Sequence, residues 1–181
     1  MQGGFKMNPV FLKYQMKRKA FFSCMALMFS LLANAQVQDP AYDLLLKQLL
    51  SHSVREISVQ EAVAKPTGIL FLDAREEREY EVSHIKSAIP VGYDDFTLAT
   101  VKDIPKNQRI IVYCSVGYRS EKVAEKLQAA GYTNVVNLYG GIFEWVNEGH
   151  EVVGPSGHPT TKVHAYNAAW GVWLKNGEKV Y

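Results

Sequence analysis

The sequence predicts an α/β fold with a mainly parallel central sheet, flanked by helices on both faces. The first observation is that short apolar runs of strand length alternate with helical segments between residues 55 and 153. The second is that these runs are continuously apolar, as in strands that are covered on both faces. Because ligands bind beyond the carboxyl ends of the strands in such sheets, these ends are the expected place of a functional site.

The composition is that of one ordinary globular domain. The chain has 181 residues, of which 48% are hydrophobic and 21% charged. Two full domains would be cramped at this length. The formal net charge of +2 gives no electrostatic reason to expect nucleic acid or an anionic membrane as a partner.

Residues 1–35 have the three-part pattern of a signal peptide. A basic stretch at 17–19 precedes an apolar stretch at 20–32, and small residues end the segment. The apolar stretch is shorter than the roughly 20 residues needed to span a bilayer, although a retained anchor stays the alternative. We therefore expect an exported protein, periplasmic or secreted, that starts at Gln36 and has no stable membrane insertion. Residues 1–15 are interpreted as an artefact of an upstream start.

The segment 36–54 is expected to form an N-terminal amphipathic helix. Its apolar residues recur at helical spacing: Tyr42, Leu45, Leu46, Leu49 and Leu50. A short helix over 58–64 follows, because Ser58 is a good N-cap and Glu61 stands three residues later.

Strands and helices then alternate along the chain. Strands are expected at 68–73, at 84–85 together with 88–91, at 109–113 and at 135–138, and helices at 76–82, 94–101, 120–130 and 142–148. Gly131 is placed to end the helix over 120–130.

A C-terminal aromatic extension is expected at 154–181. It opens with a linker over 154–159 that is rich in glycine and proline. Apolar side chains then recur at helical spacing: Val163, Tyr166, Trp170, Trp173 and Leu174. We expect this tail to pack back on the domain, with a partner-binding role as the alternative.

Cys114 is the strongest candidate for covalent chemistry. It ends the predicted strand over 109–113, and a short loop leads from it through Gly117 and Arg119 into a helix. A helix N-terminus and a nearby cation both favour the thiolate, and Gly117 lets backbone N–H groups turn inward around an anion. The chain's other cysteine, Cys24, lies within the predicted signal peptide. The alternative is an inert buried cysteine.

The segment from Arg55 to Val153 resembles a single-domain rhodanese, a sulfurtransferase module. The pieces that carry the resemblance lie at 72–75, 79–80, 84–85, 88–90, 111–120, 131–132 and 138–142, with Ala124, Leu127 and Trp145. Two positions depart from the pattern, because Ser83 and Ser87 stand where this family often has glycine.

The resemblance implies that the Cys114 thiolate takes the outer sulfur of a donor such as thiosulfate and forms a persulfide. Cyanide or a thiol would then remove that sulfur. The loop residues Ser115, Val116, Gly117, Tyr118, Arg119 and Ser120 would bind substrate and persulfide. Among them, Arg119 would steer anionic donors and Tyr118 would line the mouth of the site. No cofactor is implied, and a redox partner protein is a further expectation for an exported persulfide enzyme.

Two other functions stay open. A cysteine-dependent phosphatase or arsenate reductase is disfavoured because the loop from Cys114 to Arg119 has six residues, one fewer than the resemblance associates with a phosphate cradle. A non-catalytic sulfur carrier or binding module is the other.

The remaining polar candidates favour structural roles. Asp73 and Arg75 are expected to form an ion pair that supports the loop, not a catalytic acid and an anion clamp. His84 is also interpreted as structural. The other histidines are scattered, so no metal site is predicted: His52, His150, His158 and His164.

Overall fold

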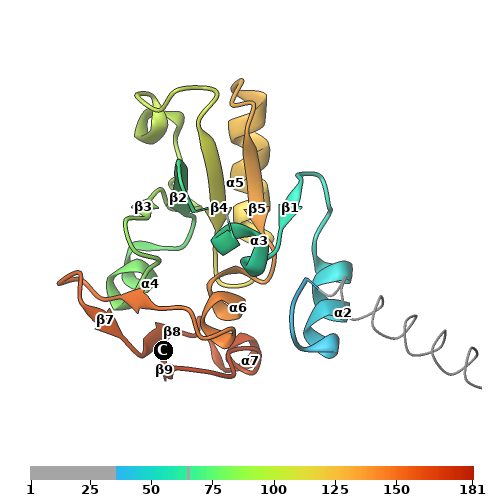
Figure 1. Cartoon of the computed structure of the whole chain (residues 1–181), viewed down its shortest axis with the longest axis vertical. Helices are drawn as coiled ribbons and strands as arrows, with labels where there is room; N and C mark the ends of the chain where they lie inside the picture. Colours follow the sequence, from blue (N-terminus) through green and yellow to red (C-terminus); the bar gives the residue numbers. More distant parts are fainter. Residues whose placement is uncertain (1–35, 65) are drawn as a thin grey trace, which may run out of the picture. The chain divides into compact units, whose positions relative to one another are not determined.

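The computed structural model describes residues 36–64 and 66–181, so the predicted signal peptide lies outside the described residues. Its central sheet has five parallel strands in the order β1-β5-β4-β2-β3 (Figure 1). Their bounds are Glu56–Ile57 for β1, Ile69–Asp73 for β2, Ile89–Pro90 for β3, Arg109–Tyr113 for β4 and Val135–Leu138 for β5. The predicted α/β fold with a parallel sheet is confirmed.

Helices pack on both faces of this sheet. The helices of the described chain are α2 (Pro40–Leu49), α3 (Val59–Ala64), α4 (Glu77–Val82), α5 (Tyr118–Ala129), α6 (Gly141–Asn147) and α7 (Ala168–Gly171). Strand β4 shows the two-sided burial directly. Ile111 and Tyr113 belong to the hydrophobic cluster that includes α2 and α6, whereas Ile110 and Val112 belong to the cluster that includes α5. In the described part of the chain, no helix is long and apolar enough to cross a bilayer.

Helix α2 confirms the N-terminal helix expected within 36–54. The carboxylate of Asp39 accepts hydrogen bonds from the backbone N–H groups of Ala41 and Tyr42, at 2.8 and 3.3 Å, and so caps the helix. The buried Tyr42 hydroxyl donates to the carbonyl of Gly140 at 2.9 Å. The Tyr42 hydrogen bond therefore joins α2 to the turn before α6.

The prediction of a helix over 94–101 is wrong. Only one 3₁₀ turn forms there, η1 at Leu98–Val101. The reason is that Val101 is buried while Leu98 is 46% exposed, so the segment has no continuous apolar face to pack. The strand expected over 88–91 is also shorter than predicted.

The two serines that depart from the family pattern differ in their backbone conformation. Ser87 has a φ of 63°, in the left-handed region that glycine adopts most readily. Ser83 has a φ of −171°, which is ordinary extended backbone. Only the turn at Ser87 therefore carries strain from the absence of a glycine.

The extension does not form the helix that its spacing predicted. Strand β8 (Lys162–His164) pairs in parallel with β9 (Glu178–Val180), and helix is confined to the four residues of α7. Tyr166, with a φ of 64°, separates β8 from α7.

Of the two remaining predictions for the C-terminal segment, the linker over 154–159 is wrong and the packing of the tail on the domain is confirmed. The linker is instead the turn between β6 (Val152–Val153) and β7 (Pro159–Thr160), which pair antiparallel. The expectation that the tail packs back is confirmed, because Val163, Ala165 and Leu174 are fully buried in the hydrophobic cluster that includes α2 and α6.

Candidate active site

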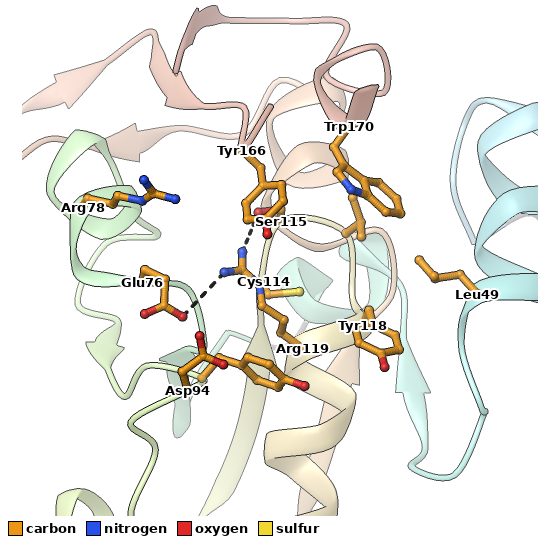
Figure 2. A pocket seen from close by; sticks show the side chains of 12 residues that line it. Leu49, Glu76, Arg78, Asp94, Cys114, Ser115, Tyr118, Arg119, Tyr166 and Trp170 are labelled. Atoms are coloured by element: carbon orange, nitrogen blue, oxygen red, sulfur yellow. Dashed lines mark hydrogen bonds and ion pairs between the residues drawn. The ribbon is translucent and has the colours of Figure 1, made fainter. Parts of the chain in front are cut away.

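Cys114 lies at the carboxyl end of β4 and lines a pocket (Figure 2). The residue is 1% exposed, and its sulfur accepts a hydrogen bond from the Gly117 N–H at 3.2 Å. Helix α5 begins at Tyr118, two residues earlier than predicted, with Gly117 as its N-cap at a φ of 120°. The N–H group and the positive end of the helix together stabilise an anionic sulfur at this position.

Helix α6 holds the loop from the opposite side. The N–H groups of Ile142 and Phe143 donate to the carbonyls of Cys114 and Ser115, at 2.9 and 3.1 Å. The approach is so close that a Cβ on Gly141 would lie 2.4 Å from the Cys114 carbonyl oxygen. Gly141 also has a φ of 58°, so any other residue would meet both a clash and backbone strain.

Asn137 is a support of the loop that sequence reasoning missed. Its side-chain amide donates to the Gly117 carbonyl at 3.0 Å, and its side-chain oxygen accepts from the Ser120 hydroxyl at 2.7 Å. Asn137 is fully buried in β5, where its neighbours Val135, Val136 and Leu138 are apolar. A polar residue inside an apolar strand was the available signal.

Arg119 is held by Glu79, the second residue that sequence reasoning did not assign to the site. Its guanidinium donates two hydrogen bonds to the buried Glu79 carboxylate, at 2.6 and 2.8 Å. A third goes to the Ser115 hydroxyl at 3.0 Å, and that hydroxyl lies 3.1 Å from Glu79 Oε1. The loop is therefore tied to α4 through a bidentate ion pair.

The pKa shifts of this pair show that it stays ionised. Burial alone would raise the pKa of Glu79, but the hydrogen bonds and charge of Arg119 outweigh it and hold that pKa below its ordinary value. Burial alone would lower the pKa of Arg119, yet the hydrogen bonds to Glu79, the nearby Cys114 side chain and the charge of Glu79 hold it above its ordinary value. The charge of Arg119 is thus balanced within the protein.

Asp73 and Arg75 form an ion pair that does not line the pocket. Both side chains are fully buried, and Arg75 donates to the two carboxylate oxygens, with Nη2 to Oδ2 at 2.6 Å. Arg75 also donates to the Ser83 carbonyl at 2.7 Å, and its guanidinium lies 5.8 Å from the ring centre of Tyr113. The ion pair that the sequence predicted is therefore present, next to Tyr113 at the end of β4, and its support of the loop stays a prediction.

The pocket has a volume of about 440 Å³ and draws its walls from several segments. The lining residues are Leu49, Glu76, Arg78, Tyr93, Asp94, Cys114, Ser115, Val116, Tyr118, Arg119, Tyr166 and Trp170. Tyr118 lies at the mouth and is 40% exposed, where the resemblance placed it. Leu49 belongs to the N-terminal extension (36–54), whereas Tyr166 and Trp170 belong to the C-terminal extension (154–181). Sequence reasoning did not place these three residues at the site. Within the described residues, no three His, Cys, Asp or Glu side chains gather as they would around a metal ion.

The fold is that of a rhodanese-like domain. The sequence model of the Rhodanese-like domain matches residues 58–148, about half of the chain, and the protein belongs to this family. A solved structure with this likeness is the BH2092 protein of Bacillus halodurans, at 29% identity and a TM-score of 0.52. That comparison covers 63% of this chain and 84% of the other.

Curated relatives match somewhat more than half of the chain. The tRNA uridine(34) hydroxylase of Hamiltonella defensa subsp. Acyrthosiphon pisum is 37% identical over 103 residues, which are 54% of this chain and 27% of the relative. The protein of that name in Yersinia enterocolitica is 33% identical over 120 residues, which are 64% of this chain and 33% of the relative. This chain therefore spans a third or less of the length of these relatives.

Proposed function

We propose that this protein is a sulfurtransferase that carries sulfane sulfur as a persulfide on Cys114. The observation that carries the proposal is the placement of the Cys114 sulfur in the pocket, with the Gly117 N–H and the N-terminus of α5 directed at it. This arrangement supports an anionic sulfur both before and after it takes up a second sulfur atom.

The proposed reaction has two steps. The Cys114 thiolate attacks the outer sulfur of a sulfane donor such as thiosulfate, a new S–S bond forms, and sulfite leaves with the electron pair of the broken bond. A thiolate or cyanide then attacks the outer sulfur of the persulfide and returns the electron pair to Cys114. This is ping-pong covalent catalysis, and no cofactor enters either step.

The surrounding residues have distinct roles in this proposal. Gly117 supplies an N–H to the anion, while the Arg119 and Glu79 pair holds Ser115 and the start of α5 in place. Tyr118 lines the route to Cys114. Because Glu79 balances Arg119, the donor is bound by hydrogen bonds and shape more than by net charge.

We also propose export, with the protein periplasmic or secreted after cleavage before Gln36. The basic, apolar and small-residue pattern of 1–35 supports this. In the described chain Gln36 is exposed, whereas Val37 is buried and the Gln38 N–H donates to Glu144 at 2.6 Å. A cut before Gln36 would leave these docking contacts in place, and N-terminal sequencing of the exported protein tests it.

Hydroxylation of tRNA, the activity in the names of the curated relatives, is less well supported. This chain spans a third or less of those relatives, and its formal net charge of +2 provides little attraction for RNA phosphates. Phosphate-ester hydrolysis is disfavoured by the six-residue loop. A non-catalytic carrier would form the persulfide without turning over.

The deciding experiment is mass spectrometry of the purified protein after incubation with thiosulfate or polysulfide. We expect Cys114 to gain one sulfur atom, and cyanide to remove it as thiocyanate with repeated turnover. Cys114→Ser should reduce transfer at least about a thousandfold without unfolding the protein. Val172→Ala, at an exposed residue that does not line the pocket, is the control and should transfer normally.

The possible outcomes separate the functions. Absence of an adduct with every sulfane donor would falsify the proposal. A stable adduct without turnover would indicate a carrier, and turnover of a phosphate ester would promote a phosphatase.

A further inference from the structure

The outer wall of the pocket is built by apolar side chains from outside the rhodanese module. Leu49 comes from α2, Tyr166 from the turn before α7, and Trp170 from α7 itself (Figure 2). All three lie outside residues 58–148, the segment that the family model matches. This wall therefore lies outside the segment that defines the family, and it faces the pocket that contains Cys114.

Hydrogen bonds fix the two aromatic residues of the wall. The Tyr166 N–H donates to Nδ1 of the buried His164 at 3.1 Å. The Asn167 side chain caps α7 by accepting from the Trp170 N–H, also at 3.1 Å. Burial lowers the pKa of His164, so its ring is neutral at pH 7 and Nδ1 stays an acceptor.

The two extensions also support each other. The ring of Trp173 stacks on Tyr42 of α2, with centroids 5.2 Å apart and an angle of 12° between the planes. The Asn147 side chain of α6 donates to the Trp173 carbonyl at 2.9 Å. The wall is thus a packed part of the fold, held on α2 and α6, and it limits what can approach Cys114.

The charges of the pocket do not sum to an anion-binding site. Arg119 is neutralised by Glu79, which leaves Glu76, Arg78 and Asp94 as the other charged lining residues. Two of these three are acidic. An oxoanion therefore gains little electrostatic attraction here, and a persulfide on Cys114 would add a further negative charge.

We propose that the pocket selects, as the acceptor of the Cys114 sulfur, a small organic thiol with an uncharged apolar body. The inference rests on the persulfide function proposed above. The volume of about 440 Å³ lies within the range of small-molecule sites, and the burial of Cys114 keeps a bulky acceptor from its sulfur. The apolar body packs on Tyr166 and Trp170, whose surface it removes from water.

The transfer step balances without another reactant. The acceptor thiol loses its proton to solvent, and its thiolate attacks the outer sulfur of the persulfide. A new S–S bond forms on the acceptor, the S–S bond to Cys114 breaks, and the electron pair returns to Cys114 as a thiolate. The product is the organic persulfide of the acceptor.

The test is single-turnover discharge of the full-chain protein after Cys114 has been loaded with polysulfide and the adduct verified by mass. The acceptors are 2-phenylethanethiol, 2-mercaptoethanol and mercaptosuccinate. Each rate is divided by the rate at which the same thiol discharges glutathione persulfide in solution, which corrects for intrinsic nucleophilicity. We expect the corrected discharge rate with 2-phenylethanethiol to exceed that with mercaptosuccinate by about tenfold or more.

Variants assign the preference to the wall. Tyr166→Ala and Trp170→Ala should each reduce it several-fold, whereas Val172→Ala should leave it unchanged. Val172 belongs to the same extension, is 51% exposed and does not line the pocket. Tyr166 is 41% exposed, so its truncation does not threaten the fold.

The outcomes keep the two proposals apart. Normal sulfur uptake followed by equal discharge to all three thiols overturns this inference and leaves the sulfurtransferase intact. A preference that survives both wall variants does the same. Failure of Cys114 to take up sulfur at all overturns the proposed function, and the acceptor inference with it.

Discussion

Two buried arginine–carboxylate pairs lie near the active loop, and they differ in what surrounds them. Asp73 and Arg75 are both fully buried, with a shortest N–O distance of 2.6 Å. Glu79 and Arg119 meet at the same distance, but Arg119 retains 13% exposure and lines the pocket. An arginine–carboxylate pair therefore braces the sheet in one place and holds the loop after Cys114 in the other.

The largest loss of stability is expected from breaking the fully buried pair of Asp73 and Arg75. Asp73→Asn removes the negative charge and leaves the buried guanidinium of Arg75 uncompensated, which should lower the free energy of unfolding by about 3–5 kcal/mol. Urea unfolding measures this loss. Sulfur transfer per folded molecule should stay within about twofold, because neither residue lines the pocket.

A double variant shows whether the loss comes from the unpaired charge. Asp73→Asn combined with Arg75→Met removes both charges and should recover part of the stability. If the double variant has a lower free energy of unfolding than Asp73→Asn alone, the unpaired charge of Arg75 is not the cause of the loss.

Arg119→Lys tests the pair of Glu79 and Arg119, which is called the pocket-side pair because Arg119 lines the pocket. Lysine keeps the charge but loses the planar fork that contacts Glu79 and Ser115. Because these contacts position the loop, we expect sulfur transfer to fall by about tenfold to a hundredfold. Turnover at saturating donor and urea unfolding are measured together.

The exposed Arg78 on the same pocket wall provides the matched control. Arg78→Lys should leave transfer nearly unchanged, because Arg78 is exposed and its position does not hold the loop. An unchanged rate for Arg119→Lys would mean that positive charge in the pocket, not the fork of Arg119, controls the reaction. Equal losses for the two lysine variants would mean that the contacts of Arg119 with Glu79 and Ser115 are not the cause.

The pocket-side pair should also make the free energy of unfolding depend on pH in the acidic range. The pKa of Glu79 in the folded protein lies below its ordinary value of 4.5, so the folded state favours the carboxylate. The resulting stability is fully present above about pH 4.5 and is lost as the pH falls through the folded pKa. Unfolding free energies measured from about pH 6 to about pH 3 should converge for the native protein and Glu79→Gln. A constant gap across that range would contradict the shift.

Local sequence was enough to place Cys114 at the start of its loop, but not to find the groups that hold this loop. Cys114, Gly117 and the start of α5 are nearly contiguous, so strand, turn and helix signals locate them together. Glu79 contacts Arg119 across 40 residues, and Asn137 contacts Gly117 across 20. Such contacts depend on strand order and on which helix faces the loop, and local periodicity specifies neither.

The extension shows a different failure of local reasoning. The spacing of Val163, Tyr166 and Trp170 fits a helix, yet β8 pairs with β9 and the backbone of Tyr166 turns left-handed. The aromatic residues were recognised as side chains that must pack somewhere. Their place at the pocket follows from tertiary packing against α2 and α6, which overrides a short helical pattern.

The smallest effect is expected at an exposed pair between the two extensions. Lys175 and Asp39 lie 3.6 Å apart, and their side chains are 53% and 32% exposed. Lys175→Met should change the free energy of unfolding by less than about 0.5 kcal/mol, because water and salt screen such pairs. Trp173→Ala is the comparison within the same contact region and should cost several times more, because it removes the stacked ring over Tyr42. A loss for Lys175→Met as large as that for Trp173→Ala would show that charge, not aromatic packing, holds the extensions together.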